Sequence, residues 1–285
     1  VNIFSMNDTQ TRGRGKRKPE VLDADAIETI LLTKIRQEQS KILEDNATTV
    51  ERSNVMKNPD KVNVLSLFTG CGGLDTGFEL AGMKGVETDE KAYAVLQDKS
   101  AYTKHKRDSI FNVFYANDIF PEALATYKRN HGSGCVYDDT DIRKIKLFPT
   151  ADVVLGGFPC PGFSAGGPRL IDDPRNFLYL HFIRCLEQAR PKMFVAENVK
   201  GMLTLGKGEV FRQIFQDFSA AGYTIHYKLL NAKDYGVPQS RERVVLVGVR
   251  KDLDFNYVFD SPVLNAQDNP VRNLKSTIGR FKDNP

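Results

Sequence analysis

The amino-acid sequence predicts an α/β domain built on a mostly parallel sheet with helices on both faces. From residue 61 onward, short apolar runs alternate with amphipathic stretches, which is the pattern of repeated strand–helix units. Glycines stand where helices of such units end, at Gly82 and Gly222. A hydrophobic fraction of 41% in 285 residues is enough to build the core of a domain of this kind.

The apolar runs are expected to be strands, and the amphipathic stretches between them helices. Ligands of parallel sheets bind beyond the carboxyl ends of the strands, so candidate functional residues are sought there. The expected strands cover residues 62–68, 112–116, 153–155, 193–196, 223–230 and 244–249, and the expected helices cover 74–81, 123–130, 177–189 and 210–221.

Residues 1–60 are expected to form an extension outside this domain. The first 20 are polar and carry five basic residues between positions 12 and 18, so they are expected to be disordered. The basic residues among them can contact the phosphate backbone of a nucleic acid. A solvated tail is the alternative. A helix is expected from Asp25 to Leu43, with Glu28 at the capping-box position, and a polar linker over residues 46–60.

Charge and cysteine spacing narrow the class of protein. The formal net charge is +4, from 40 Lys and Arg against 36 Asp and Glu, which permits a nucleic-acid partner without requiring one. The apolar runs are too short to span a bilayer, so no membrane association is expected. The four cysteines lie far apart with no Cys-x-x-Cys pair, so no metal site and no disulfide framework is expected.

The first expected strand runs into a glycine turn, Phe68-Thr-Gly-Cys-Gly-Gly-Leu74, and then into a helix. Gly70, Gly72 and Gly73 let the backbone approach a ligand closely, and the start of the helix offers free N–H groups. The spacing is neither the dinucleotide G-x-G-x-x-G nor a P-loop, which favours a nucleoside cofactor without a pyrophosphate. A tight turn without a ligand is the alternative.

Acidic residues follow the next two apolar stretches. Asp118 stands at the end of the second strand, where a carboxylate can accept hydrogen bonds from ribose hydroxyls, and Ile119 can pack on an adenine ring. Asp141 and Ile142 follow in an equivalent place. Each carboxylate alone can be a helix cap or a surface residue, but their order along the chain favours the cofactor interpretation.

The segment from Gly156 to Ser164, GGFPCPGFS, holds Cys160 between two prolines just beyond a buried strand. This framing restricts the chain without improving its packing, so it favours a reactive cysteine over a buried structural one. An ordinary thiol has a pKa of about 8.5 and is little ionised at neutral pH. A nearby cation or helix N-terminus would raise the thiolate fraction.

Two later motifs carry polar groups at strand ends. Glu197 and Asn198 follow a buried strand, where a partly desolvated carboxylate is suited to hold or share a proton; the alternative is a cap of the next turn. In PQSRER, alternation places Gln239, Arg241 and Arg243 on one face, which suits a base carbonyl and phosphates. A solvated edge strand is the alternative.

Taken in order, FTGCGG, the strand ending in Asp118, GGFPCPGFS, AENV and PQSRER resemble the motifs of the cytosine-5 DNA methyltransferase family. The resemblance covers residues 61 to about 250. It implies S-adenosylmethionine as cofactor and a class I methyltransferase fold, a mostly parallel seven-stranded sheet with an antiparallel seventh strand. It also implies double-stranded DNA as substrate, in the cytoplasm of a bacterium or the nucleus of a eukaryote.

The family motifs imply roles for individual residues. Cys160 is implied to be the nucleophile that adds to C6 of a flipped-out cytosine, and Glu197 to contact N3 and the amino group of that base. Arg241 and Arg243 are implied to anchor the flipped base and its surroundings. The further candidates for substrate contact are Ser164, Asn198 and Gln239.

The resemblance also implies which residues surround the cofactor. They come from the glycine turn, from the acidic positions after the second and third apolar stretches, and from the two sides of the cysteine loop. The implied cofactor residues are Phe68, Gly70, Gly72, Gly73, Leu74, Asp118, Ile119, Asp141, Ile142, Pro159 and Leu178.

The sequence departs from the family pattern in three places. Pro161 stands where the family commonly has Gln, and residues 83–110 resemble an insertion that is expected to be a surface excursion near the cofactor. Beyond residue 250 only a tail to residue 285 follows, so the family's target-recognition domain and closing helix are expected to be absent. A truncation, or a second chain that supplies them, would account for this.

Two alternatives to a DNA methyltransferase stay open. The tRNA methyltransferase branch shares this architecture and these motifs. A cofactor- or DNA-binding subunit that is inactive by itself would also agree with the basic arm and the absent recognition domain.

Overall fold

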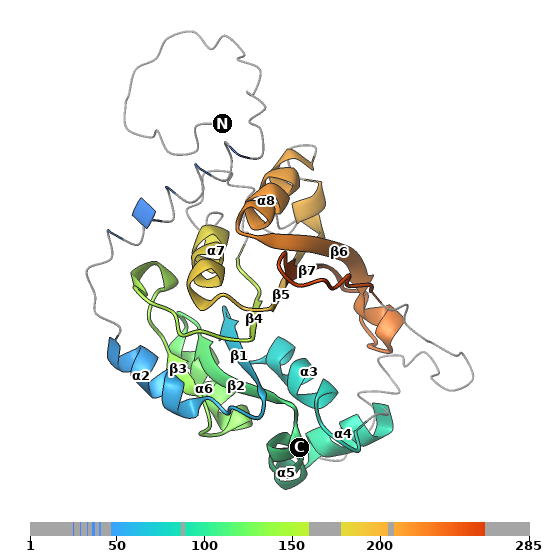
Figure 1. The fold of residues 1–285 in the computed structure, drawn as a ribbon. Coiled ribbons are helices and arrows are strands. Elements are labelled where there is room, and N and C mark those ends of the chain that lie inside the picture. Colours follow the sequence, from blue (N-terminus) through green and yellow to red (C-terminus); the bar gives the residue numbers. More distant parts are fainter. Residues whose placement is uncertain are drawn as a thin grey trace.

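A computed structural model describes residues 47–86, 89–159, 178–204 and 208–259, with isolated positions between 25 and 40. One seven-stranded sheet with the order β3-β2-β1-β4-β5-β7-β6 forms its centre, and helices pack on both faces (Figure 1). The strands are β1 (Val62–Leu67), β2 (Phe111–Asn117), β3 (Val136–Asp138), β4 (Val153–Gly156), β5 (Met193–Val199), β6 (Tyr223–Asn231) and β7 (Glu242–Arg250).

The pairing of the strands confirms the predicted sheet. β1 pairs in parallel with β2 and β4, β2 with β3, and β4 with β5. β7 lies between β5 and β6 and is antiparallel to both. This antiparallel last strand agrees with the class I methyltransferase fold that the motifs imply. β3 was not predicted, because three residues are too few to show a period.

The helices between the strands include all four that the sequence predicts. In the described residues, three short 3-10 segments follow strand ends: η1 (Ile142–Lys144), η4 (Lys200–Leu203) and η6 (Ala232–Tyr235). The α-helices are α2 (Ala47–Met56), α3 (Gly73–Ala81), α4 (Asp89–Gln97), α5 (Lys99–Asp108), α6 (Pro121–His131), α7 (Leu178–Ala189) and α8 (Glu209–Ala220).

Two apolar clusters fix the helices to the sheet. On one face, α7 and α8 pack through Phe182 and Phe218 against β5, where Phe194 stacks on Phe218 with ring centroids 4.8 Å apart. On the other face, α3 and α6 pack against strand residues such as Val64 and Val113. Because side chains alternate along a strand, β1 supplies both clusters, and the sheet is buried on both sides.

The polar linker expected over residues 46–60 was wrong, because α2 occupies most of it. This helix lies beside β2 and β3, at the edge of the sheet (Figure 1). Its apolar side chains Val55 and Met56 are exposed, whereas the Asn112 amide of β2 donates to the Met56 carbonyl over 2.9 Å. A helix held in this way has no apolar stripe by which its sequence would reveal it.

Residues 83–110, expected to form a surface excursion, are largely exposed, but they have regular structure. The segment forms α4 and α5, and Val95 and Tyr102 of these helices build a small core with Met83 and Val86, which precede α4. Asp98 caps α5 by accepting from the Ser100 backbone N–H over 2.8 Å. The segment is thus packed structure beside α3.

The N-terminal extension is described only in part. The isolated described positions between 25 and 40 are helical and exposed, in agreement with the predicted helix. The basic arm and the stretch from residue 260 onward lie outside the described residues. Among the described helices, none is long and apolar enough to cross a lipid bilayer.

Candidate active site

The carboxyl ends of β1, β4 and β5 meet at a pocket of about 420 Å³. Parallel pairing brings these ends to one edge of the sheet, so motifs far apart in the sequence share the pocket. It joins the glycine turn, the start of the cysteine loop, AENV and PQSRER. The lining residues are Ser66, Leu67, Phe68, Thr69, Gly73, Leu74, Asp75, Gly156, Gly157, Glu197 and Arg241.

The glycine turn has a left-handed backbone at Phe68 (φ 54°), Gly70 (φ 54°) and Gly72 (φ 90°). A Cβ at Gly70 or Gly73 would meet no atom within 4 Å, so these positions are open to a ligand. α3 starts at Gly73, and no side chain caps it, which leaves its first N–H groups available for an anion. This open turn fits a nucleoside cofactor with a carboxylate.

Asp118 connects the turn to the end of β2. Its carboxylate is buried and accepts from the Gly70 N–H over 2.8 Å and from the Phe120 N–H over 3.0 Å. Beside it, Ile119 and Phe120 are 51% and 66% exposed. Ile119 and Phe120 offer an apolar surface on which the ring of a ligand can stack. Phe120 was not predicted as part of the site, although its position directly after Ile119 could have indicated it.

Asp141 and Ile142 lie apart from the described pocket lining. Asp141 caps η1 and pairs with Arg143, whose Nε lies 3.0 Å from Oδ1; this hydrogen bond is the main cause that lowers the pKa of Asp141. Ile142 is buried, and its carbonyl accepts from Arg184 over 2.7 Å. Arg184 is itself 1% exposed. Its hydrogen bond to Ile142 was not predicted, because a single arginine in a helix does not indicate in the sequence that it is buried.

Glu197 and Arg243 form an ion pair beside the pocket, with 2.7 Å between Oε1 and Nε. The β5–β7 register places Arg243 opposite Val199, two residues beyond Glu197, so the guanidinium reaches back along the strand. Both side chains are partly exposed, at 34% and 26%. A Cβ at Gly157 would lie 3.3 Å from Glu197 Oε2, so a glycine there lets the loop approach the carboxylate.

Gln239 and Arg241 do not continue β7, which starts at Glu242. The alternation expected from Gln239 was therefore wrong, because it presupposed strand geometry. Hydrogen bonds fix Arg241 instead: its N–H donates to Asn231 Oδ1 over 3.1 Å, and its carbonyl accepts from the Ala232 N–H over 2.9 Å. Arg241 lines the pocket, whereas Gln239 is exposed and is absent from the pocket lining.

The cysteine loop is anchored at its start. Cys160 and Ser164 lie outside the described residues, whereas Pro159 and, after the loop, Leu178 are partly buried. The Asn198 amide, which is buried, donates to the Phe158 carbonyl over 3.0 Å.

Asn198 also accepts, through Oδ1, from the Val199 N–H over 2.8 Å. Both bonds tie its side chain to backbone, so Asn198 supports the loop that leads into Cys160. These bonds indicate a positioning residue, and the contact with substrate expected for Asn198 stays a prediction.

Comparison with known proteins agrees with this geometry. Residues 62–285 match the family model of the C-5 cytosine-specific DNA methylases. The chain is 51% identical over 279 residues to the Type II methyltransferase M.BsuRI of Bacillus subtilis, covering 96% of this chain and 64% of that protein. It is 50% identical over 277 residues to M.BspRI of Lysinibacillus sphaericus, covering 96% and 65%.

A solved structure described as a DNA modification methyltransferase encoded within a prophage of E. coli superimposes with a TM-score of 0.50, at 27% identity. The match covers 70% of this chain and 49% of that one. The chain thus spans less than two thirds of the length of the relatives named here, and nothing in these matches supports a second chain that carries a recognition domain. By its sequence, its sheet and the motifs gathered at one sheet edge, the chain belongs to the family of C-5 cytosine-specific DNA methylases.

Proposed function

We propose that this chain transfers a methyl group from S-adenosylmethionine to C5 of a cytosine flipped out of double-stranded DNA, through a covalent bond between Cys160 and C6. The observation that carries the proposal is the Glu197–Arg243 pair, which borders a pocket shared with the glycine turn and the loop that leads to Cys160. The names of the relatives, Type II methyltransferases, support the same reaction and a place beside a restriction enzyme.

The residues present fit the cofactor. The uncapped start of α3 would hold the carboxylate of its methionine part, and Asp118 would accept from the ribose hydroxyls with lone pairs that Gly70 and Phe120 leave free. Ile119 would lie against the adenine. When bound, S-adenosylmethionine supplies an electrophilic methyl group.

The chain's own groups would activate the base. C5 of cytosine is a weak nucleophile, and addition of the Cys160 thiolate to C6 turns it into an enamine carbon. Negative charge then develops at N3, where Glu197 would share a proton, while Arg243 holds the carboxylate in place. After C5 has taken the methyl group, transfer of the C5 proton to a base such as water and release of the Cys160 thiolate restore the aromatic ring. Because these atoms are inaccessible in a duplex, the base must leave the stack.

Transfer of radiolabelled methyl groups to DNA and to tRNA tests the proposal. Label in DNA and none in tRNA is expected, together with a covalent adduct on DNA that contains 5-fluorocytosine. Cys160→Ser is expected to abolish both label and adduct while cofactor binding persists. Label in tRNA alone would assign the chain to the tRNA branch, and cofactor binding without any adduct would indicate a non-catalytic subunit.

A further inference from the structure

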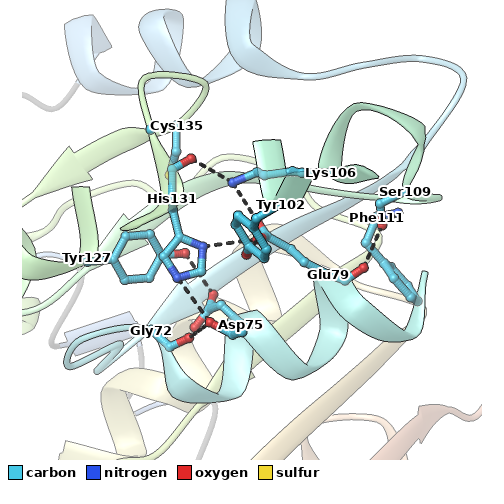
Figure 2. A network of polar contacts seen from close by, with 12 residues as sticks. Gly72, Asp75, Glu79, Tyr102, Lys106, Ser109, Phe111, Tyr127, His131 and Cys135 are labelled. Atoms are coloured by element: carbon cyan, nitrogen blue, oxygen red, sulfur yellow. Dashed lines mark hydrogen bonds and ion pairs between the residues drawn. The ribbon is translucent and has the colours of Figure 1, made fainter. Parts of the chain in front are cut away.

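A buried network of charged and polar side chains lies directly behind the glycine turn (Figure 2). Its centre is Glu79 of α3, which is fully buried. Lys106 of α5 places Nζ 2.7 Å from Glu79 Oε1, and His131 of α6 places Nδ1 3.1 Å from Glu79 Oε2. The Tyr102 hydroxyl, also from α5, donates to Oε2. Three helices therefore meet on one carboxylate.

The network continues from His131 to the turn itself. His131 Nε2 lies 3.3 Å from the Thr76 hydroxyl, and that hydroxyl donates to the Gly72 carbonyl over 2.8 Å. The imidazole also forms a wall of the turn, because a Cβ at Gly72 would lie 2.4 Å from Nε2. A displacement of His131 would therefore be felt at Gly72.

The direction of two contacts in the network follows from the groups involved. The Thr76 hydroxyl has one proton and donates it to the Gly72 carbonyl. Nδ1 of His131 faces the Glu79 carboxylate, which has only acceptor atoms, so Nδ1 donates in that contact. Lys106 and His131 therefore both hold the buried Glu79, and Asp75 is buried four residues earlier on the same helix.

A second branch reaches the pocket. Asp75, which lines the pocket, accepts from the Ser66 hydroxyl over 3.0 Å and from the Tyr127 hydroxyl over 3.1 Å. The Tyr127 ring stacks on His131 with centroids 4.1 Å apart. The turn is thus held from the Gly72 carbonyl and from the side of Asp75, and both routes pass through His131.

We propose that Glu79, Lys106 and His131 are positioning residues that hold the glycine turn in the shape that binds the cofactor. This assigns a role to the segment between α3 and β2, because α5 of this segment carries Lys106. Without the positive charge of Lys106, Glu79 would be a buried anion without an ionic partner in this segment. The inference rests on the proposed function. It assigns to these residues an effect on cofactor affinity, and none on the chemical step at Cys160.

Two pairs of variants test this by calorimetric titration with S-adenosylhomocysteine, without turnover. Thr76→Val removes the hydroxyl between His131 and Gly72, and Thr126→Val is its control, because that exposed hydroxyl also donates to a carbonyl four residues earlier. Lys106→Met removes the counter-charge, and Lys104→Met is its control on the exposed side of α5. Thr76→Val is expected to raise the dissociation constant about threefold to tenfold, and Lys106→Met more. The controls leave it unchanged.

Steady-state kinetics complete the test. At saturating cofactor, kcat of Thr76→Val stays within about twofold of the wild type, while KM for the cofactor rises with the dissociation constant. If Lys106→Met fails to fold, Thr76→Val and Tyr102→Phe decide. Wild-type affinity in both of these would overturn the inference alone. A wild-type chain that binds no cofactor would overturn the proposed function and the inference with it.

Discussion

Arg243 at the start of β7 holds the carboxylate of Glu197 on β5, with 2.7 Å between Nε and Oε1. The antiparallel last strand makes this contact possible, because it returns the PQSRER motif to the end of the strand that carries AENV. The pair sets the orientation of Glu197, which among the described lining residues of the pocket carries the carboxylate that is partly exposed.

Replacement of Arg243 by Gln is therefore expected to lower methyl transfer at least tenfold, because the Glu197 carboxylate loses both its partner and its fixed orientation. Cofactor affinity should stay at the wild-type value. Radiolabel transfer and calorimetry measure the two effects. Arg250→Gln is the matched control, since Arg250 pairs with Asp252 at the far end of the same strand. Equal losses in both variants would mean that β7 as a whole had been disturbed.

The Asn198 amide holds the Phe158 carbonyl at the start of the loop that leads to Cys160, and its loss should slow the reaction proposed for Cys160. Asn198→Asp keeps the acceptor for the Val199 N–H but places a carboxylate oxygen against the Phe158 carbonyl. We expect the rate of adduct formation with 5-fluorocytosine DNA to fall by up to about tenfold, because the loop loses its buried anchor. Asn112→Asp, which removes the donor to Met56 at the edge of the sheet, should leave the rate unchanged. An unchanged rate in Asn198→Asp would exclude the positioning role.

A comparison of alanine variants at Gly72 and Gly85 distinguishes the cost of backbone strain from the cost of a steric clash. Both have positive φ, 90° and 79°, but a Cβ at Gly85 would meet nothing within 4 Å. Gly85→Ala is expected to lower the free energy of unfolding by about 1 kcal/mol. Gly72→Ala should lower it by clearly more, because its Cβ would also lie 2.4 Å from His131 Nε2. Urea denaturation measures the difference, and equal losses would show that His131 yields without cost.

The fold was largely predictable because its strands and major helices bury apolar faces with a regular period. The exceptions have physical causes. β3 is too short to show a period, and α2 is held by polar contacts. In α5 the residues that face the protein are the buried Tyr102 and the partly buried, charged Lys106, so no apolar stripe marks a helix that is nevertheless packed. Hydrophobic periodicity does not detect a helix that is anchored by charges.

The site was predictable as a set of motifs but not as a set of contacts. The motif order indicated that Glu197 and Arg243 belong to one site, whereas their ion pair depends on the register between β5 and β7. In the same way, the sequence places Asn198 beside Glu197 at the end of a strand but does not show its partner. Strand alternation turns the Asn198 amide into the protein, where it donates to the Phe158 carbonyl at the start of the cysteine loop.

The stability of the chain in acid should depend on Glu79. Burial acts to raise the pKa of this carboxyl, but the hydrogen bond from His131 and the charge of Lys106 outweigh it and hold that pKa below its ordinary value of 4.5. A carboxyl whose pKa is lower in the folded state stabilises the fold above its unfolded pKa, and this contribution is lost as the pH falls through the folded value. The pKa of Asp75, nearby on α3, is shifted in the opposite direction, because burial raises it above 3.8.

The lowered pKa of Glu79 predicts the effect of Glu79→Gln. This variant should lower the Tm at pH 7, where the wild-type carboxylate is ionised, and the Tm difference between the two proteins should shrink as the pH is lowered below about 4.5. Thermal unfolding between pH 3 and pH 7 tests this. In the variant, Lys106 and His131 face a neutral amide at every pH. A Tm difference that stays constant between pH 3 and pH 7 would show that Glu79 is not ionised in the folded wild type.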